Sequence, residues 1–218
     1  MLKLKFENTV HKQRFALGVI CGLLPILCTL FGLLSCTYGD NPVYILNSIS
    51  ETYYSNHKII MVISLGLCTF FFATYHGYDL GDRVFTILSA VGALGVAAFP
   101  CSSSFYNLDY VGLFSLPIKV SNIIHFISAF LVFGSFTLMT LTQFTKGTDK
   151  TRNKIYYICG AIMGIALLGV VVIPNFPFRM MILEFIMLEA FAVAWITKSK
   201  VKFLTLLNKK IRRSIQYV

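Results

Sequence analysis

Residues 155–173 read IYYICGAIMGIALLGVVVI, a run of 19 residues without a charged side chain. A bilayer core of about 30 Å requires about 20 mainly apolar residues in a helix. The run is apolar throughout rather than at alternate positions, which favours a helix over a membrane strand. A transmembrane helix is therefore predicted here.

Five further runs of the same kind lie on either side of this one, and none of them contains Lys or Arg. They cover residues 15–36, 59–77, 84–101, 121–141 and 180–197. We therefore predict an all-α polytopic membrane protein, a six-transmembrane-helix bundle. Residues 1–200 are expected to form this single domain, and residues 201–218 a basic cytoplasmic tail.

The composition excludes most other classes of protein. Of the 218 residues, 56% are hydrophobic and only 13% are charged, and the mean hydropathy is +0.74. A soluble domain carries about 25% charged residues, and a core of this size cannot hide so much apolar surface. A soluble enzyme, a disordered chain and a fibrous repeat are therefore excluded.

The basic residues are distributed unevenly over the segments that would flank these helices. Of the 19 Lys and Arg residues, 16 fall in the amino-terminal segment, the second-to-third and fourth-to-fifth loops and the tail. Only Lys58, Lys119 and Arg179 fall on the other side. Because cytoplasmic loops carry the excess of Lys and Arg, both termini are predicted to be cytoplasmic. This placement also explains the net charge of +10, so no nucleic-acid partner is expected.

The tail over residues 201–218 has an amphipathic pattern. Apolar residues such as Phe203, Leu207 and Ile211 recur at roughly helical spacing, while Lys209 and Arg212 occupy other faces. Such a segment can bind anionic lipid headgroups, at about 1 kcal/mol per basic residue near the surface. The simpler interpretation, which we favour, is a basic anchor that fixes the orientation of the chain.

Ionisable residues inside predicted spans are the first candidates for function, because burying them in a membrane is costly. His125 lies in the fourth span, and Glu184 and Glu189 lie in the sixth. At about 1.5 Å per residue, His125 and Glu184 both lie about 6 Å from the outer end of their spans. We predict that these two side chains face each other. Glu189 lies deeper and about 140° further around its helix, so it should contact a different neighbour.

The first external loop is rich in hydroxyl groups and ends at the second span. It could cover a pocket formed by His125 and Glu184, which would bind a lipid headgroup or a small ligand. The alternative is an interhelical hydrogen bond beside an ordinary solvated loop. The candidate ligand-binding residues are His125, Glu184, Glu189, Ser48, Ser50, Glu51, Tyr53, Tyr54 and Asn122.

Motifs for better-defined chemistry are missing from the sequence. It contains no G-x-S-x-G, H-E-x-x-H, P-loop or C-x-x-C pattern, and its histidines do not offer paired haem ligands. No metal and no cofactor are therefore expected, and no catalytic residue is assigned. Asp82 is expected to cap the third helix.

Cys36 and Cys101 both lie at the external end of a predicted span. They could form a disulfide if their Cα atoms lie within about 7 Å of each other. We favour the alternative of two free cysteines in packed helix ends, because free cysteine is commonly buried.

The order of several short motifs resembles a known family. SIS-E-TYY at residues 48–54 precedes Gly92-Ala93-Leu94-Gly95, and His125 precedes Ser128-Ala129-Phe130. Glu184 and Glu189 then precede the run FAVAW at residues 191–195. This layout resembles the six-helix DRAM/Sfk-type membrane proteins and related bacterial six-helix proteins. The family includes members tied to lipid-anchor remodelling and membrane trafficking, so the resemblance implies lipid handling.

Three functional hypotheses follow. The first is a lipid-binding membrane protein with an outward-facing polar pocket. The second is a non-catalytic structural or regulatory membrane protein. The third is a small proton-coupled transporter, for which inverted repeats and paired broken helices would be expected but are not evident. Whether the protein is an enzyme, and its oligomeric state, are left open by the sequence.

Overall fold

The structure is a computed structural model that describes residues 2–38, 41–43, 46–77, 79–103 and 105–199, with side chains over 9–30 and from residue 46 onward within these ranges. The predicted tail and the side chain of Cys36 lie outside the described residues. The six α-helices of the described chain are α1 Leu2–Ser35, α2 Lys58–Thr74, α3 Leu80–Ala98, α4 Ile118–Thr142, α5 Lys150–Val172 and α6 Arg179–Ser199.

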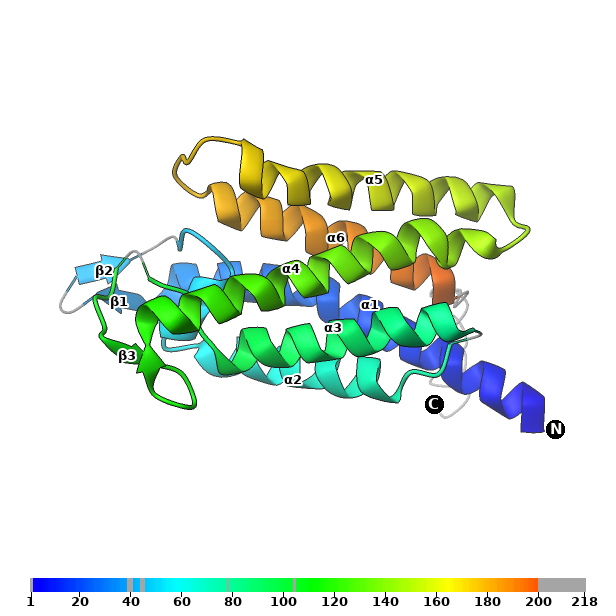
Figure 1. Ribbon diagram of the computed structural model, residues 1–218, viewed down its shortest axis with the longest axis horizontal. Coiled ribbons are helices and arrows are strands. Elements are labelled where there is room, and N and C mark those ends of the chain that lie inside the picture. Colours follow the sequence, from blue (N-terminus) through cyan, green and yellow to red (C-terminus); the bar gives the residue numbers. More distant parts are fainter. Residues whose placement is uncertain (1, 39–40, 44–45, 78, 104, 200–218) are drawn as a thin grey trace, which may run out of the picture.

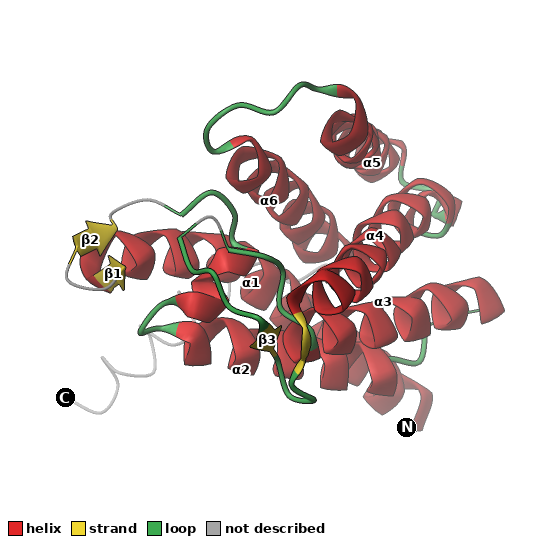
Figure 2. Cartoon of the chain, turned by 60° about the vertical axis from the view of Figure 1, so that its left-hand side comes forward, coloured by secondary structure: helices red, strands yellow, loops and turns green. Residues whose placement is uncertain are grey.

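The helices run up and down and form a closed ring. Each helix packs against the next in the chain, and α6 packs against α1. Figure 1 shows that α1 begins and α6 ends at the same end of the bundle, which we call the terminal end. The opposite end, the hairpin end, carries the connection between α5 and α6 and the short strands (Figure 2).

Short elements that the sequence did not predict lie at the hairpin end. Strands β1 Cys36–Tyr38 and β2 Asn41–Val43 form one antiparallel hairpin, and β3 Tyr110–Val111 pairs with β4 Leu116–Pro117 in another. A 3₁₀-helix, η1 Ser50–Tyr54, lies in the first loop, and a second, η2 Phe144–Lys146, follows α4. Gly112 follows β3 with φ at 80°, a conformation that glycine adopts without strain.

Five helices of the described chain, all except α2, are long and apolar enough to cross a membrane. The second predicted segment, 59–77, is helical only over Lys58–Thr74, a length of 17 residues. It ends early because Tyr75 is extended, and Arg83 Nη1 donates to the carbonyl oxygens of Ala73 at 2.7 Å and Tyr75 at 2.9 Å.

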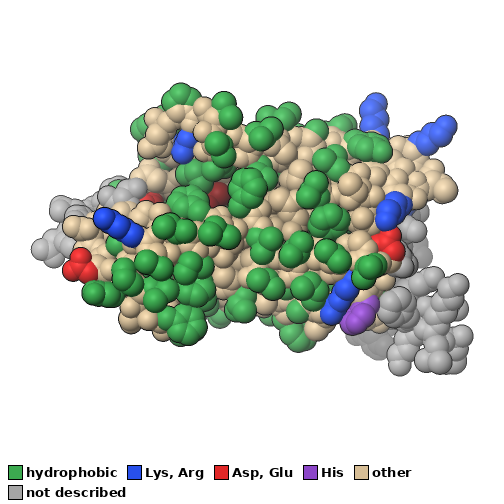
Figure 3. Space-filling view, viewed as in Figure 1, with side chains coloured by type: hydrophobic (Ala, Val, Ile, Leu, Met, Phe, Trp, Pro, Cys, Tyr) green, Lys and Arg blue, Asp and Glu red, His purple; other side chains and the backbone are tan. Residues whose placement is uncertain are grey.

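The outer surface of the bundle is apolar along its middle. Ile127, Phe130, Ile165, Leu168 and Val172 each expose more than half of their surface. Figure 3 shows hydrophobic side chains spread between the two ends, with Lys and Arg side chains near the ends. Soluble monomers rarely expose so much contiguous apolar surface, and this distribution is the one expected of a bundle in a bilayer.

Small residues bring neighbouring helices close together. A methyl group added to Gly92 of α3 would lie 2.6 Å from Val132 Cγ2 and 2.8 Å from the Ser128 carbonyl oxygen of α4. On α1, a methyl group on Gly18 would lie 3.1 Å from the Ala192 carbonyl oxygen of α6. The contacts between α3 and α4 and between α1 and α6 therefore leave no room for a side chain at Gly92 or Gly18.

An aromatic cluster fills the interior toward the terminal end. Phe136 of α4 stacks on Phe191 of α6, with ring centroids 3.4 Å apart and an angle of 5° between the rings. Trp195 is fully buried and lies edge-on to Phe72 and Tyr75 of the α2 region. The cluster connects three helices that are distant in sequence.

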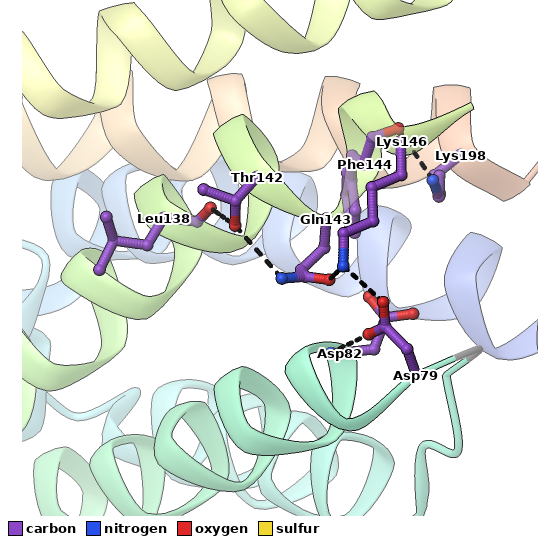
Figure 4. Close-up of polar contacts among 8 residues, drawn as sticks. All are labelled: Asp79, Asp82, Leu138, Thr142, Gln143, Phe144, Lys146 and Lys198. Carbon is purple, nitrogen blue, oxygen red and sulfur yellow. Dashed lines mark hydrogen bonds and ion pairs between the residues drawn. The ribbon is translucent and has the colours of Figure 1, made fainter. Parts of the chain in front are cut away.

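The cap of α3 differs from the prediction. Asp79, rather than Asp82, precedes the helix, and its side chain accepts a hydrogen bond from the Asp82 backbone N–H at 2.9 Å. The reason is that α3 begins at Leu80, four residues before the predicted span, so Asp82 lies in its first turn. Figure 4 shows Asp79 bonded in turn to Lys146 of η2 across the terminal end.

Candidate functional site

A polar cavity of about 490 Å³ opens at the hairpin end. Figure 3 shows acidic side chains set back in a hollow near this end. We call it the outer cavity. Its polar lining residues are Asn47, Ser48, Ser50, Glu51, Ser102, Asn122, His125, Asn175, Arg179 and Glu184. Six of the nine predicted ligand-binding residues are therefore brought together: His125, Glu184, Ser48, Ser50, Glu51 and Asn122.

The first loop is held over α6 by its own hydrogen bonds. The Met181 backbone N–H donates to the Asn47 carbonyl oxygen at 2.9 Å. Glu51 Oε2 accepts from the Asn47 backbone N–H at 2.8 Å, and Ser48 Oγ accepts from the Glu51 backbone N–H at 3.1 Å. Polar residues of this loop are consequently fixed at one wall of the cavity.

Glu184 joins this loop to α6. Its Oε2 accepts a hydrogen bond from the Ile49 backbone N–H at 2.6 Å, and its Oε1 accepts from Ser50 Oγ at 3.1 Å. Only 6% of the residue is exposed. The carboxylate thus lies at the start of η1, where it accepts from a backbone N–H that has no partner within the helix.

His125 and Glu184 both line the outer cavity, but no hydrogen bond or ion pair between them is found in the described chain. The His125 ring instead bonds through Nδ1 to the Phe99 carbonyl oxygen at 2.8 Å. Each group is compensated by backbone atoms of a neighbouring loop, so neither requires the other. Because a carbonyl oxygen only accepts, Nδ1 carries a proton, and in the neutral imidazole Nε2 then holds the lone pair.

The start of α4 fixes the segment that follows α3. Ser121 Oγ donates to the Pro100 carbonyl oxygen at 2.8 Å, and Asn122 Oδ1 accepts from the Ser102 backbone N–H at 2.8 Å. With the His125 bond, these contacts hold residues 99–102 against α4. His125 and Asn122 therefore shape the wall of the cavity as well as lining it.

Tyr53 and Tyr54 lie outside the outer cavity. The Tyr54 hydroxyl donates to the Cys101 carbonyl oxygen, and its ring stacks on Tyr106 with centroids 6.0 Å apart. Burial raises the pKa of Tyr54 above its ordinary value, which keeps this donor protonated. Tyr53 packs partly against the hydrophobic core. Both tyrosines therefore stabilise the first loop and do not line the cavity.

Cys101 lines the cavity and is buried. Burial, followed by the nearby carboxylates of Glu184 and Glu51, raises the pKa of its thiol well above the ordinary value. The thiol is therefore protonated and a poor nucleophile. The proposed disulfide to Cys36 stays a prediction, since that partner's side chain is not among those described.

Glu189 occupies a different environment, as its position on the helix predicted. It does not line the outer cavity and lies beside α1, where a methyl group added to Gly22 would lie 3.7 Å from Glu189 Oε2. Its Oε1 is buried and has no hydrogen-bond partner in the described chain. Glu184 and Glu189 therefore cannot serve one binding site.

Arg179 is the charged cavity residue that the site prediction missed, and the polar residues Asn47, Ser102 and Asn175 were missed as well. Arg179 begins α6, directly before the apolar run. Its Nη1 donates to the Ile173 carbonyl oxygen, and its Nε is buried without a partner in the described chain. The available signal was that Arg179 is one of only three basic residues on the side predicted to be external.

A second, apolar cavity of about 60 Å³ lies inside the bundle. We call it the inner slot. It is lined by residues of five helices, including Leu24, Met61, Ala93, Ala129 and Leu188. Ser50 and Glu184 line both the slot and the outer cavity, so the two spaces meet at these side chains.

Comparisons with protein-family models, with curated proteins and with solved structures find no match to this chain.

Proposed function

We propose that all six helices cross a membrane, with both termini in the cytoplasm and the hairpin end outside. The 16-to-3 distribution of basic residues supports this orientation. Although α2 has only 17 residues, it packs between α1 and α3. These neighbours can shield its ends, so that a helix shorter than the bilayer core still spans the membrane. Adjacent helices and snorkelling residues commonly accommodate a short span.

Labelling of introduced cysteines tests this topology. A cysteine at Asn56, in the first loop, should react with an impermeant maleimide added to intact cells. A cysteine at Thr148, between α4 and α5, should react only after the membrane is made permeable. Labelling of Thr148→Cys in intact cells would contradict the orientation, and the unmodified chain measures the background.

We further propose that the protein binds a membrane lipid, with the headgroup in the outer cavity and part of an acyl chain in the inner slot. The observation that carries this proposal is the meeting of a polar and an apolar space at Ser50 and Glu184. Only an amphiphile satisfies both environments, because a polar ligand gains nothing from the slot. The expected orientation, with the headgroup outward, is that of an outer-leaflet lipid.

The sizes of the two spaces fit different parts of such a ligand. The outer cavity, at about 490 Å³, falls within the 300–1,000 Å³ that is typical of ligand pockets. The inner slot, at about 60 Å³, holds roughly four to six water-sized spheres, since each needs 10–15 Å³. It therefore admits a short chain segment, and the rest of the lipid would lie against the exposed helices.

Filling the slot tests lipid binding. Ala129→Leu introduces a side chain into the slot, whereas Gly66→Leu on α2 faces open space and serves as the control. Lipid that stays bound through purification would be quantified by mass spectrometry. We expect Ala129→Leu to lose most of it and Gly66→Leu to keep it. Equal amounts in both variants and in the unmodified protein would contradict the proposal.

A structural or regulatory role is the second candidate. It is favoured by the backbone partners of His125 and Glu184, which give both side chains a role in holding loops. The similarity to DRAM/Sfk-type proteins is also part of our proposal, and it agrees with a function in lipid handling. We assign no catalytic step.

A further inference from the structure

Two opposite charges face the outer cavity without neutralising each other. Arg179 lies at the start of α6 and Glu184 lies five positions later, and both side chains line the space. Neither forms an ion pair within the described part of the chain. A ligand that enters therefore meets a cation and a carboxylate at separate places.

Arg179 retains capacity to bind an anion. Its Nη1 bonds to the Ile173 carbonyl oxygen, and its Nη2 lies 4.0 Å from Met180 Sδ, a weak acceptor. Its Nε is buried and has no partner among the described residues. A guanidinium group has five N–H donors and matches phosphate oxygens in a bidentate geometry.

The acidic side of the cavity is built by Glu184 and Glu51. Both are buried, with 6% and 3% of their surface exposed. The hydrogen bonds to Glu184 come from an uncharged backbone N–H and a hydroxyl group, so no cation of the described chain compensates it. Each carboxylate oxygen has two lone pairs, and a ligand ammonium group can still bind there.

We propose that the outer cavity recognises a headgroup carrying both a phosphate and an ammonium group, with the phosphate at Arg179 and the ammonium at Glu184 and Glu51. This inference rests on the proposed lipid-binding function and specifies its ligand class. A headgroup with phosphate alone would bring no cation to the Glu184 carboxylate, and a neutral headgroup would bring no charged partner to either Glu184 or Arg179. Complementary charge provides specificity in this way.

The two common headgroups of this class differ in how they would meet the acidic side. A primary ammonium donates hydrogen bonds to carboxylates, whereas a quaternary ammonium interacts with aromatic faces. Phe126, Phe176 and Phe178 also line the cavity. Ethanolamine and choline lipids are therefore compared as separate arms of the test.

The test uses the purified full-length protein in detergent and native mass spectrometry. The probes are dioleoyl phosphatidylethanolamine, phosphatidylcholine, phosphatidylglycerol and diacylglycerol, which share their acyl chains. We expect either amine lipid to bind on the order of tenfold more tightly than phosphatidylglycerol or diacylglycerol, as one charge-assisted contact implies.

Two variants separate the charges. Arg179→Gln should reduce the preference for the amine lipids over diacylglycerol, and Glu184→Gln should reduce their preference over phosphatidylglycerol, each by on the order of tenfold. Lys119→Gln, an exposed cation outside the cavity, and Glu189→Gln, a carboxylate outside it, should change neither ratio. If Glu184→Gln does not fold, the half-exposed Arg179 still tests the phosphate half.

The outcomes distinguish this inference from the lipid-binding proposal. Equal binding of all four lipids, or ratios unchanged by Arg179→Gln, would overturn the charge recognition and leave lipid binding intact. Binding of none of the four lipids would overturn both.

Discussion

The two ends of the bundle use charged side chains differently. At the terminal end, Lys146 Nζ contacts Asp79 Oδ2 at 2.5 Å and Gln143 Oε1 at 2.6 Å, and Lys198 Nζ donates to the Phe144 carbonyl oxygen at 3.0 Å (Figure 4). At the hairpin end, Arg179 and Glu184 line one cavity and do not pair. The contrast indicates that charged side chains join helices at the terminal end. Our proposal is that those at the hairpin end bind a ligand instead.

The difference also appears in what surrounds each charge. Lys198 lies over the rings of Phe144 at 5.1 Å and Tyr156 at 5.5 Å, so aromatic faces stabilise it within the protein. Arg14 Nε donates to the Tyr75 hydroxyl at 2.8 Å. Each of these contacts joins two different elements of the bundle, so the charged side chains at the terminal end have a structural role.

Removing the Glu184 carboxylate should have the largest effect on stability. Glu184→Ala leaves the Ile49 N–H and Ser50 Oγ without their acceptor, and should cost about 3 kcal/mol, given 1–3 kcal/mol for each unsatisfied buried group. Unfolding in mixed micelles measures this free energy. Glu189→Ala is the matched control, because Glu189 Oε1 accepts no hydrogen bond from the described residues. Equal losses would show that Glu184 does not anchor the loop.

The Tyr75 hydroxyl should contribute the next largest amount. Tyr75→Phe removes the acceptor of the Arg14 Nε–H and should cost about 2 kcal/mol, as hydrogen bonds to charged groups do. Lipid preference at the hairpin end should not change. Tyr157→Phe, at a residue 55% exposed, provides the control in the same unfolding assay. A change in lipid preference would show that the two ends are coupled.

Asp79 should contribute about 1 kcal/mol to stability through its cap of α3, so Asp79→Ala should lower the free energy of unfolding by this amount. Asp109→Ala, in an exposed loop, is the control and should not lower it.

The stability that Asp79 provides should also depend on pH. The Lys146 hydrogen bond, followed by the Asp82 N–H, lowers the pKa of Asp79 below its ordinary value of 3.8. The stabilisation that ionised Asp79 gives the folded protein is therefore complete above its ordinary pKa. It is lost as the pH falls through the lowered pKa of the folded state. Unfolding measured between pH 7 and pH 3 should show the difference between the variant and the unmodified protein shrinking.

Lys146→Gln should have the smallest effect. The side chains of Lys146 and Asp79 are 55% and 41% exposed, and an exposed ion pair contributes roughly 0.2–1 kcal/mol. The loss should diminish further at high salt, when the pair is screened. A loss of several kcal/mol, or one independent of salt, would mean that this contact does more than join α3 to η2.

The sequence predicted the helices well because long apolar runs have few alternatives, and the cost of burying charge pointed to His125 and Glu184. The partners of these residues were not predictable. The Phe99 carbonyl and the Ile49 N–H are backbone groups, and their positions depend on how the loops fold. Arg179 was missed because it lies one residue outside the predicted span, and the capping residue of α3 changed because that helix begins earlier.

The most direct test of the account is an experimental density map of the protein in lipid nanodiscs that contain phosphatidylethanolamine. We expect headgroup density in the outer cavity, with its phosphate beside Arg179 and its amine beside Glu184, and chain density entering the inner slot. A cavity filled by ordered water, with Arg179 and Glu184 joined to each other or to protein groups, would contradict it.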